Sequence, residues 1–141
     1  MRPTFAYDPA TEQIYSFDPD KANQILTDAG WQEGSDGIRA KNGQKLELYW
    51  PIISRPRDNA MATSVQASLH DVGIDLKVDP LERAAAREAY DQNRYDISFM
   101  WFSYGDPDVL RTIFHSSNVG AFNRAKYQVP EVRFVARCSP S

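Results

Sequence analysis

Strand-like and helix-like segments alternate along this 141-residue chain, and that order restricts the fold more than any single residue does. Apolar alternation predicts three strands, at residues 46–50, 74–78 and 95–102. Helical spacing of apolar residues predicts helices over about 58–72, 81–90 and 107–115. A helix after each strand is typical of a parallel sheet with right-handed crossovers. The sequence therefore predicts an α/β fold, with a mostly parallel sheet flanked by helices.

A further helix is marked at both of its ends. Asp18 can cap its start, Pro19 suits its first position and Gly30 can stop it. Four apolar residues recur inside it at helical spacing and predict one buried stripe, made by Ala22, Ile25, Leu26 and Ala29.

Turn-forming residues follow this helix. Glycines at positions 34 and 37 and the pair Asn42-Gly43 flank the short segment Ile38–Ala40. We expect a small hairpin here, with Leu46–Trp50 as its second arm. Pro51 is expected to close that strand, because proline has no backbone N–H to donate to a ladder.

The stretch YDISFMWFSYGDPD, at residues 95–108, combines a strand with a helix start. The strand delivers Trp101 and Tyr104 to the carboxyl-terminal edge of the sheet, and Asp106 can cap the helix that begins at Pro107. In open α/β sheets, ligands bind at that edge. Aromatic faces with a few polar groups are typical of a small-molecule site.

Composition limits the classes of function. The hydrophobic content of 42% suits one ordinary globular domain, and the net charge of −3 argues against nucleic acid as a partner. The single cysteine, Cys138, excludes an internal disulfide framework and a multi-cysteine metal site. His70 and His115 have no cysteine nearby and no second histidine at ligand spacing, so we expect no metal, and we also expect no cofactor. No apolar run approaches the ~20 residues of a membrane span, and Met1–Phe5 lacks the apolar core of a secretion signal.

Catalytic motifs are weak. A small hydrolase that uses His115, or the acid pair Asp106 and Asp108, stays open as an alternative. No Gly-x-Ser-x-Gly elbow, phosphate-binding loop or dinucleotide fingerprint occurs, and both acids suit the first turn of a helix. We therefore interpret the chain as a binding module with no catalytic residues.

Five segments, in order, resemble motifs of family 5 extracellular solute-binding proteins, the dipeptide, oligopeptide and nickel type receptors of ABC importers. The segment FDPDKANQILTDAGW at residues 17–31 is similar to the family's "DPEKA…LL…AGW" helix. Residues 37–48 resemble its "GIR…DGKPLEL" hairpin, and residues 66–78 its "QA.L..IGI.V.V" helix and strand. Residues 95–108 resemble "YDL…W..DYPDPD", and residues 123–132 resemble "N…Y..PEVD".

The resemblance implies most of the second lobe of a type II periplasmic-binding-protein fold. On this interpretation, residues 1–17 form an extended lead-in, residues 18–132 a single α/β lobe, and residues 133–141 a divergent, disordered tail. The missing first lobe would supply the other wall of a cleft for a peptide or small-molecule ligand. The resemblance also implies an ABC importer permease as partner and a periplasmic location for the parent receptor. The residues expected to contact the ligand are Trp101, Tyr104, Asp106, Phe122 and Asn123.

Two departures from the family pattern bear on these expectations. Peptide binders of the family carry an Asp shortly after the strand Trp, which holds the ligand's α-amino group; here Asp106 is the nearest candidate, after a segment one residue shorter. The sequence also leaves the family pattern after Val132. A truncated gene, a frameshift or an excised lobe would each explain that, so a remnant without function of its own is the alternative to a working binding module.

Overall fold

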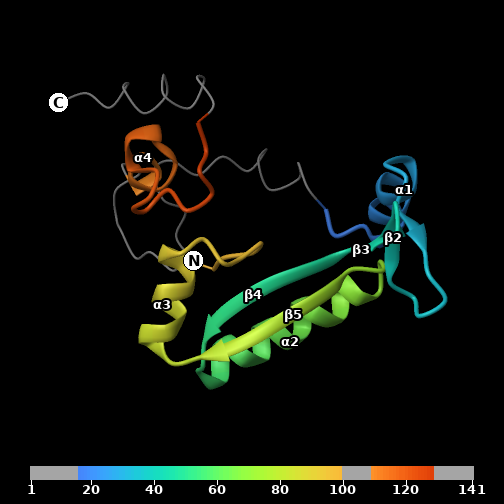
Figure 1. Cartoon of the computed structure of the whole chain (residues 1–141), viewed down its shortest axis with the longest axis horizontal. Coiled ribbons are helices and arrows are strands. Elements are labelled where there is room, and N and C mark those ends of the chain that lie inside the picture. The colour runs from blue at the N-terminus through green and yellow to red at the C-terminus, as the bar shows by residue number, and fades with distance from the viewer. Residues whose placement is uncertain (1–15, 100–108, 129–141) are drawn as a thin grey trace. The chain divides into compact units, whose positions relative to one another are not determined.

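A computed structural model of the chain describes residues 16–99 and 109–128 (Figure 1). The chain divides into two compact units. One comprises residues 8–98, and the other comprises residues 1–7 together with 99–141.

Helix α1 (Pro19–Asp28) has the ends that the sequence predicts. The Asp18 carboxylate accepts a hydrogen bond from the backbone N–H of Lys21 at 2.9 Å, and Pro19 occupies the first turn. Gly30 has a positive φ of 87° and donates its N–H to Thr27, which closes the helix. The residues that cap α1 lie close to its ends in the sequence, so the sequence alone was sufficient to place this helix.

The buried stripe predicted for α1 is wrong. Ala22 and Leu26 are only half-buried, while Ile25 is 57% exposed and Ala29 is exposed. Helical spacing of apolar residues defines a face, but it does not supply an element to cover that face.

A small antiparallel sheet follows α1, in the order β1 (Gln32–Glu33), β2 (Arg39–Lys41), β3 (Gln44–Lys45). The predicted turn at Asn42-Gly43 joins β2 to β3, and both of its residues have positive φ, at 54° and 80°. The predicted second arm is wrong, because Gln44 and Lys45 form it and the strand after Leu46 pairs elsewhere.

The centre of this unit is a parallel pair of strands with a crossover helix, as the sequence predicts. Strand β4 (Glu47–Ile53) pairs with β5 (Asp75–Leu81), and α2 (Pro56–His70) connects them. In Figure 1, α2 lies along one face of the pair. The core on that face consists of Trp50, Ile52, Ala62 and Leu76, with Leu48, Met61, Val65, Leu69, Val78 and Ile97 packed around it.

Pro51 does not close its strand, contrary to the prediction. It lies inside β4, opposite Asp79. The backbone N–H and C=O of Tyr49, two residues earlier, bond away from β5 to Asp96, and strand alternation directs Pro51 the same way. The missing N–H therefore costs the β4–β5 ladder nothing, and the carbonyl of Pro51 accepts a hydrogen bond from the Tyr90 hydroxyl.

Helix α3 (Arg83–Asp91) follows β5 and buries Ala86, Ala89 and Tyr90. The next segment, expected to be a third strand from Tyr95, has no strand ladder over residues 95–99. The N–H groups of Asp96 and Ile97 both donate to the carbonyl of Tyr49, and the carboxylate of Asp96 accepts from the N–H of Tyr49. A side chain thus takes the place of the backbone acceptor that a ladder needs.

Residues 109–128 belong to the second unit. Helix α4 (Val109–Phe114) matches the later part of the helix predicted from Pro107, whose start lies outside the described residues. A 3₁₀ turn, η2 (Ser116–Asn118), and a bridge between Val119 and Asn123 follow it. None of the helices in the described ranges is both long and apolar enough to cross a membrane.

Candidate functional site

The carboxyl-terminal ends of β4 and β5 meet two helix starts. The N–H of Ser54 donates to the carbonyl of Leu81 at 2.8 Å, directly after the two strands end. Helices α2 and α3 begin at Pro56 and Arg83, and neither preceding residue makes a side-chain capping bond. This edge is where α/β sheets bind ligands. Neither helix start was predicted as a ligand contact, although the proline at position 56 marks one of them.

Three of the five predicted ligand contacts lie outside the described residues. These are Trp101, Tyr104 and Asp106. Their place at the sheet edge stays a prediction.

The other two, Phe122 and Asn123, lie next to each other in the loop after η2, and their side chains differ sharply in exposure. Asn123 has no exposed surface, whereas Phe122 is 53% exposed. The amide of Asn123 donates to the carbonyls of Phe114, His115 and Tyr127 and accepts from the N–H of Tyr127. The loop is therefore closed by one asparagine side chain.

Apolar side chains are exposed around this loop. Phe114 and Tyr127 form an edge-to-face pair with ring centroids 6.1 Å apart, and each is still more than a third exposed. Exposed apolar groups that lie close together are typical of protein, membrane or ligand interaction sites. Within residues 109–128 the large apolar side chains exposed by more than a third are Leu110, Phe114, Val119, Phe122 and Tyr127.

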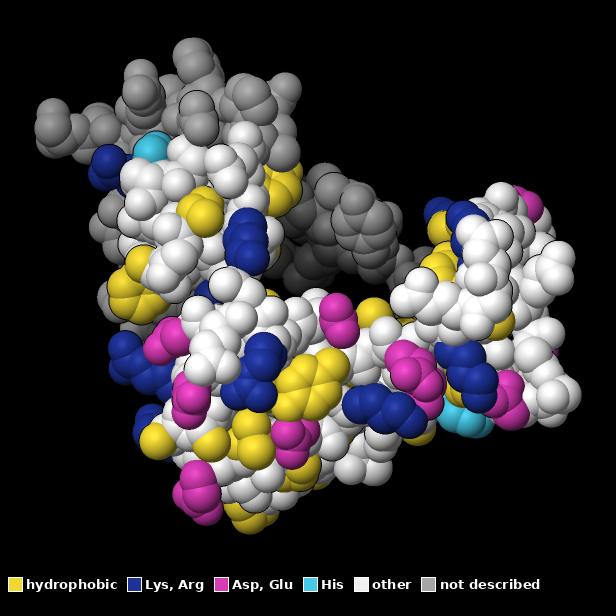
Figure 2. Space-filling view, viewed as in Figure 1, with side chains coloured by type: hydrophobic (Ala, Val, Ile, Leu, Met, Phe, Trp, Pro, Cys, Tyr) yellow, Lys and Arg dark blue, Asp and Glu magenta, His cyan; other side chains and the backbone are white. Residues whose placement is uncertain are grey.

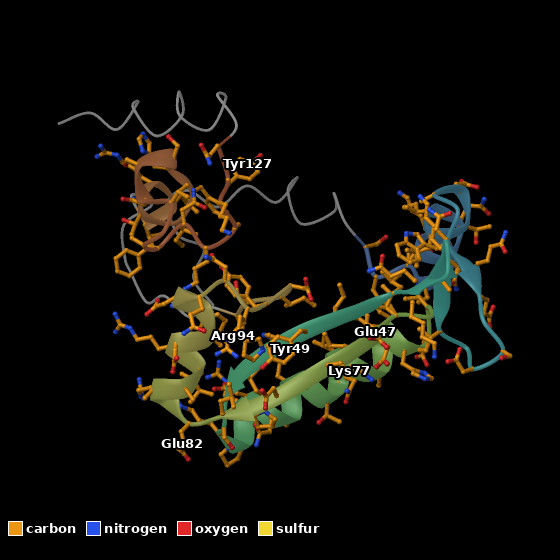
Figure 3. The ribbon with its side chains drawn as sticks, viewed as in Figure 1. Glu47, Tyr49, Lys77, Glu82, Arg94 and Tyr127 are labelled. Carbon is orange, nitrogen blue, oxygen red and sulfur yellow. The ribbon has the colours of Figure 1, made fainter. Side chains whose placement is uncertain are left out.

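The face of β4 and β5 opposite α2 is polar. The strand register places Glu47 and Tyr49 on this face beside Asp75, Lys77 and Asp79. Figure 3 shows Glu47, Tyr49 and Lys77 over the strands, and Figure 2 shows acidic and basic side chains interspersed there. The Tyr49 hydroxyl donates to Asp79 at 2.5 Å. That hydrogen bond, and then burial, raise the pKa of Tyr49.

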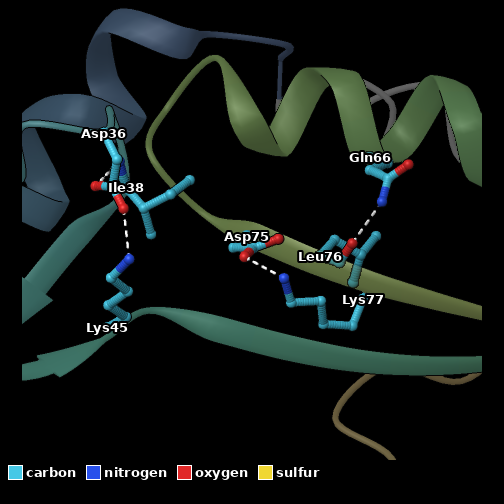
Figure 4. Close-up of polar contacts among 7 residues, drawn as sticks. All are labelled: Asp36, Ile38, Lys45, Gln66, Asp75, Leu76 and Lys77. Carbon is cyan, nitrogen blue, oxygen red and sulfur yellow. Dashed lines mark hydrogen bonds and ion pairs between the residues drawn. The ribbon is translucent and has the colours of Figure 1, made fainter.

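Two ion pairs lie near the start of the same strands (Figure 4). Lys45 contacts Asp36 at 2.5 Å, and Lys77 contacts Asp75 at 2.6 Å. These contacts raise the pKa of each lysine, while the hydrogen bonds from Lys45 and from the N–H of Ile38 lower the pKa of Asp36. Each of these four charged side chains is already paired with an oppositely charged one, so we assign no ligand to them.

His115 caps the turn that follows α4. Its Nδ1 accepts a hydrogen bond from the N–H of Ser117 at 3.2 Å and lies 2.8 Å from the Ser117 hydroxyl. A serine and a histidine in contact suggest a nucleophile and a base, but these two residues belong to one turn, and a local cap accounts for their contact. Among the described residues, no group of three His, Cys, Asp or Glu side chains could hold a metal ion.

Comparison with known proteins gives a consistent family. The family described as "Bacterial extracellular solute-binding proteins, family 5 Middle" matches residues 1–121. Protein XP55 of Streptomyces lividans is 39% identical over 119 residues, which is 79% of this chain and 21% of that protein. The oligopeptide-binding protein AppA of Bacillus subtilis is 31% identical over 111 residues, which is 74% of this chain and 20% of AppA.

Solved structures give the same result. AppA in complex with a nonapeptide has a TM-score of 0.78 at 26% identity, covering 95% of this chain and 28% of AppA. NikZ from Campylobacter jejuni in complex with Ni(L-His) has a TM-score of 0.75 at 27% identity, covering 89% of this chain and 26% of NikZ. The fold is thus that of one lobe of a type II periplasmic binding protein. The chain spans about a fifth of the length of the curated relatives it matches, and it belongs to family 5 of the bacterial extracellular solute-binding proteins.

Proposed function

We propose that this chain forms one wall of the ligand cleft in a solute-binding protein of an ABC importer. The observation that supports this most strongly is the family match over residues 1–121, which includes the parallel β4–α2–β5 unit. Its relatives are binding proteins, which supports a role in binding rather than catalysis. A permease partner and a periplasmic or extracellular location are expected for the full-length receptor.

The solute is a peptide or another small molecule. One matched relative is an oligopeptide-binding protein solved with a nonapeptide, and another was solved with Ni(L-His). The wall would consist of Trp101 and Tyr104 from the sheet edge, Asp106 at the following helix start, and the loop that carries Phe122 and Asn123. Aromatic side chains would supply the apolar surface, and the loop and Asp106 would supply polar groups.

Binding would work through closure of two lobes. A ligand that contacts both lobes stabilises the closed form because its contacts are complete only there. One lobe alone provides about half of those contacts. We therefore expect the isolated chain to bind a solute with roughly millimolar affinity, about 4 kcal/mol short of micromolar affinity.

The test is a calorimetric titration of the 141-residue chain with the AppA nonapeptide and, separately, with Ni(L-His). Millimolar binding that weakens in Trp101→Ala and is retained in Trp31→Ala would support the proposal. Micromolar affinity would contradict it, since a single wall would then suffice. Equal losses in both variants would also contradict it, because Trp31 lies beside the small antiparallel sheet, in the unit of residues 8–98.

A further inference from the structure

The loop that follows α4 buries one side chain completely and exposes its neighbour. Asn123 is fully buried, and the side chain before it, Phe122, keeps 53% of its surface exposed. Both residues were expected to contact a ligand, but one side chain is buried and the other is exposed, so we infer different roles for them.

Nearly all of the hydrogen-bonding capacity of the Asn123 amide is used inside the loop. One N–H donates to the carbonyl of Tyr127 at 2.8 Å, and the other is shared between the carbonyls of Phe114 and His115 at 3.2 and 3.3 Å. The amide oxygen accepts from the N–H of Tyr127 at 3.0 Å. An asparagine amide has two donor hydrogens and one acceptor oxygen, so each of its polar atoms has a partner.

A solute could reach this amide only by breaking the loop. A buried polar group left without its partner carries the full cost of its desolvation, and up to four backbone groups would lose theirs. That loss exceeds what one hydrogen bond to a solute returns. Direct contact with Asn123 is therefore unfavourable.

Further hydrogen bonds, made by the backbone and by Asn118, fix the chain around Phe122. The N–H of Asn123 donates to the carbonyl of Asn118 at 3.0 Å, and the carbonyl of Phe122 accepts from the N–H of Arg124 at 2.9 Å. Asn118 is anchored in turn by its side-chain amide, which donates to the carbonyls of Arg111 and Thr112. Both polar groups of the peptide bond between Phe122 and Asn123 are therefore hydrogen-bonded, so the backbone that carries the Phe122 ring is fixed.

We propose that Asn123 is a positioning residue that holds Phe122 outward, and that, of these two residues, only Phe122 contacts the solute. This inference rests on the proposed function, and it assigns the recognition at this loop to an aromatic face. Such a face favours an apolar side chain or a planar group of the solute over an anionic one.

The test compares three variants of the ¹⁵N-labelled chain: Asn123→Ala, Phe122→Ala and, as a control, Gln128→Ala, an exposed amide near the end of the same loop. The first measurement is amide hydrogen exchange. Asn123→Ala should speed exchange at Tyr127 about tenfold or more and leave the amides of β5 unchanged, because the lost bonds are confined to the loop. Unchanged exchange at Tyr127 would overturn the holding role.

The second measurement is the shift of the loop signals when the nonapeptide or Ni(L-His) is added at millimolar concentration. The account predicts that Asn123→Ala and Phe122→Ala both lose the response of residues 118–123 and that Gln128→Ala keeps it. Retention of that response in Asn123→Ala would overturn the positioning role, and retention in Phe122→Ala with loss in Asn123→Ala would show that Asn123 itself binds. If the unmodified chain responds to neither probe, the proposed function fails, while the exchange measurement still decides whether Asn123 holds the loop.

Discussion

The Nε of Arg39 donates a hydrogen bond to the carbonyl of Val72 at 2.9 Å and so joins the small antiparallel sheet to the end of α2. Arg39 is only 7% exposed, and its other nitrogens bond to Trp31, Asn23 and Thr27 around the end of α1. Within residues 16–99 and 109–128, Arg39 makes no ion pair with a carboxylate. Carbonyls near the negative ends of two helices offset its charge instead.

Replacing Arg39 should destabilise the unit of residues 8–98. Arg39→Ala would leave the carbonyls of Val72 and Trp31 without donors, and we expect a loss of about 2–4 kcal/mol in the free energy of unfolding. The measurement is urea denaturation. Arg87→Ala is the matched control, because Arg87 is exposed and its ion pair with Asp91 spans 3.6 Å, so the loss should stay below about 0.5 kcal/mol. Similar losses in the two variants would contradict the role assigned to Arg39.

A methyl group at Gly73 should be far more costly than one at Gly43. Both glycines have a positive φ, of 83° and 80°, but an added Cβ at Gly73 would lie 2.6 Å from Cγ of Arg39, whereas at Gly43 nothing lies within 4 Å. Gly43→Ala should therefore cost only the backbone strain, about 1–2 kcal/mol. Gly73→Ala should cost about 3 kcal/mol or more, since it also displaces the buried arginine. Equal changes in the urea midpoint would show that the contact with Arg39 does not matter.

The bond between Tyr49 and Asp79 predicts a dependence of stability on alkaline pH. The hydrogen bond to Asp79 raises the pKa of Tyr49 above its ordinary value of 10.0, so the folded state retains the phenol proton more strongly than the unfolded state does. The resulting stabilisation is present below pH 10.0 and is lost as the pH rises through the higher folded-state pKa.

Tyr49→Phe tests this dependence. The variant should be less stable by about 1 kcal/mol or less near pH 8, because the bond is only half-buried. The difference between the two proteins should shrink at a pH above the raised folded-state pKa of Tyr49, where the unmodified chain loses the phenol proton and with it the bond. Urea midpoints at the two pH values provide the measurement. The pKa values of Lys45 and Lys77 are also raised, so both proteins should lose some stability in this range. A difference that stays constant across the range would contradict the account.

The sequence was most informative where structure is decided by nearby residues. Asp18 and Pro19 set the start of α1, Asn42-Gly43 sets the hairpin turn, and spacing alone located the β4–α2–β5 unit. Each of these rests on capping, turn chemistry or a local apolar pattern, which needs no knowledge of distant partners.

Features that depend on distant partners could not be predicted in this way. Pro51 sits inside β4 because its missing N–H points away from β5, and that direction depends on which strand pairs with which. Arg39 was missed because arginine is rarely buried, and its partners lie 8 to 33 residues away in the chain. For the loop after η2, the sequence pointed to Phe122 and Asn123 together, but only the hydrogen bonds of the Asn123 amide separate a buried residue from an exposed one.

The three tryptophans provide the decisive measurement for a ligand-cleft wall that contains Trp101, because their indole N–H groups give three separate NMR signals. Trp50 lies in the core at 3% exposure and Trp31 beside the small antiparallel sheet, whereas Trp101 is the predicted solute contact. On titration with the nonapeptide and with Ni(L-His) to millimolar concentration, the account predicts that the Trp101 signal moves and that the other two stay in place. A cleft wall that contains Trp101 would be contradicted if the Trp31 or Trp50 signal moved while the Trp101 signal did not. It would also be contradicted if no signal moved with either solute.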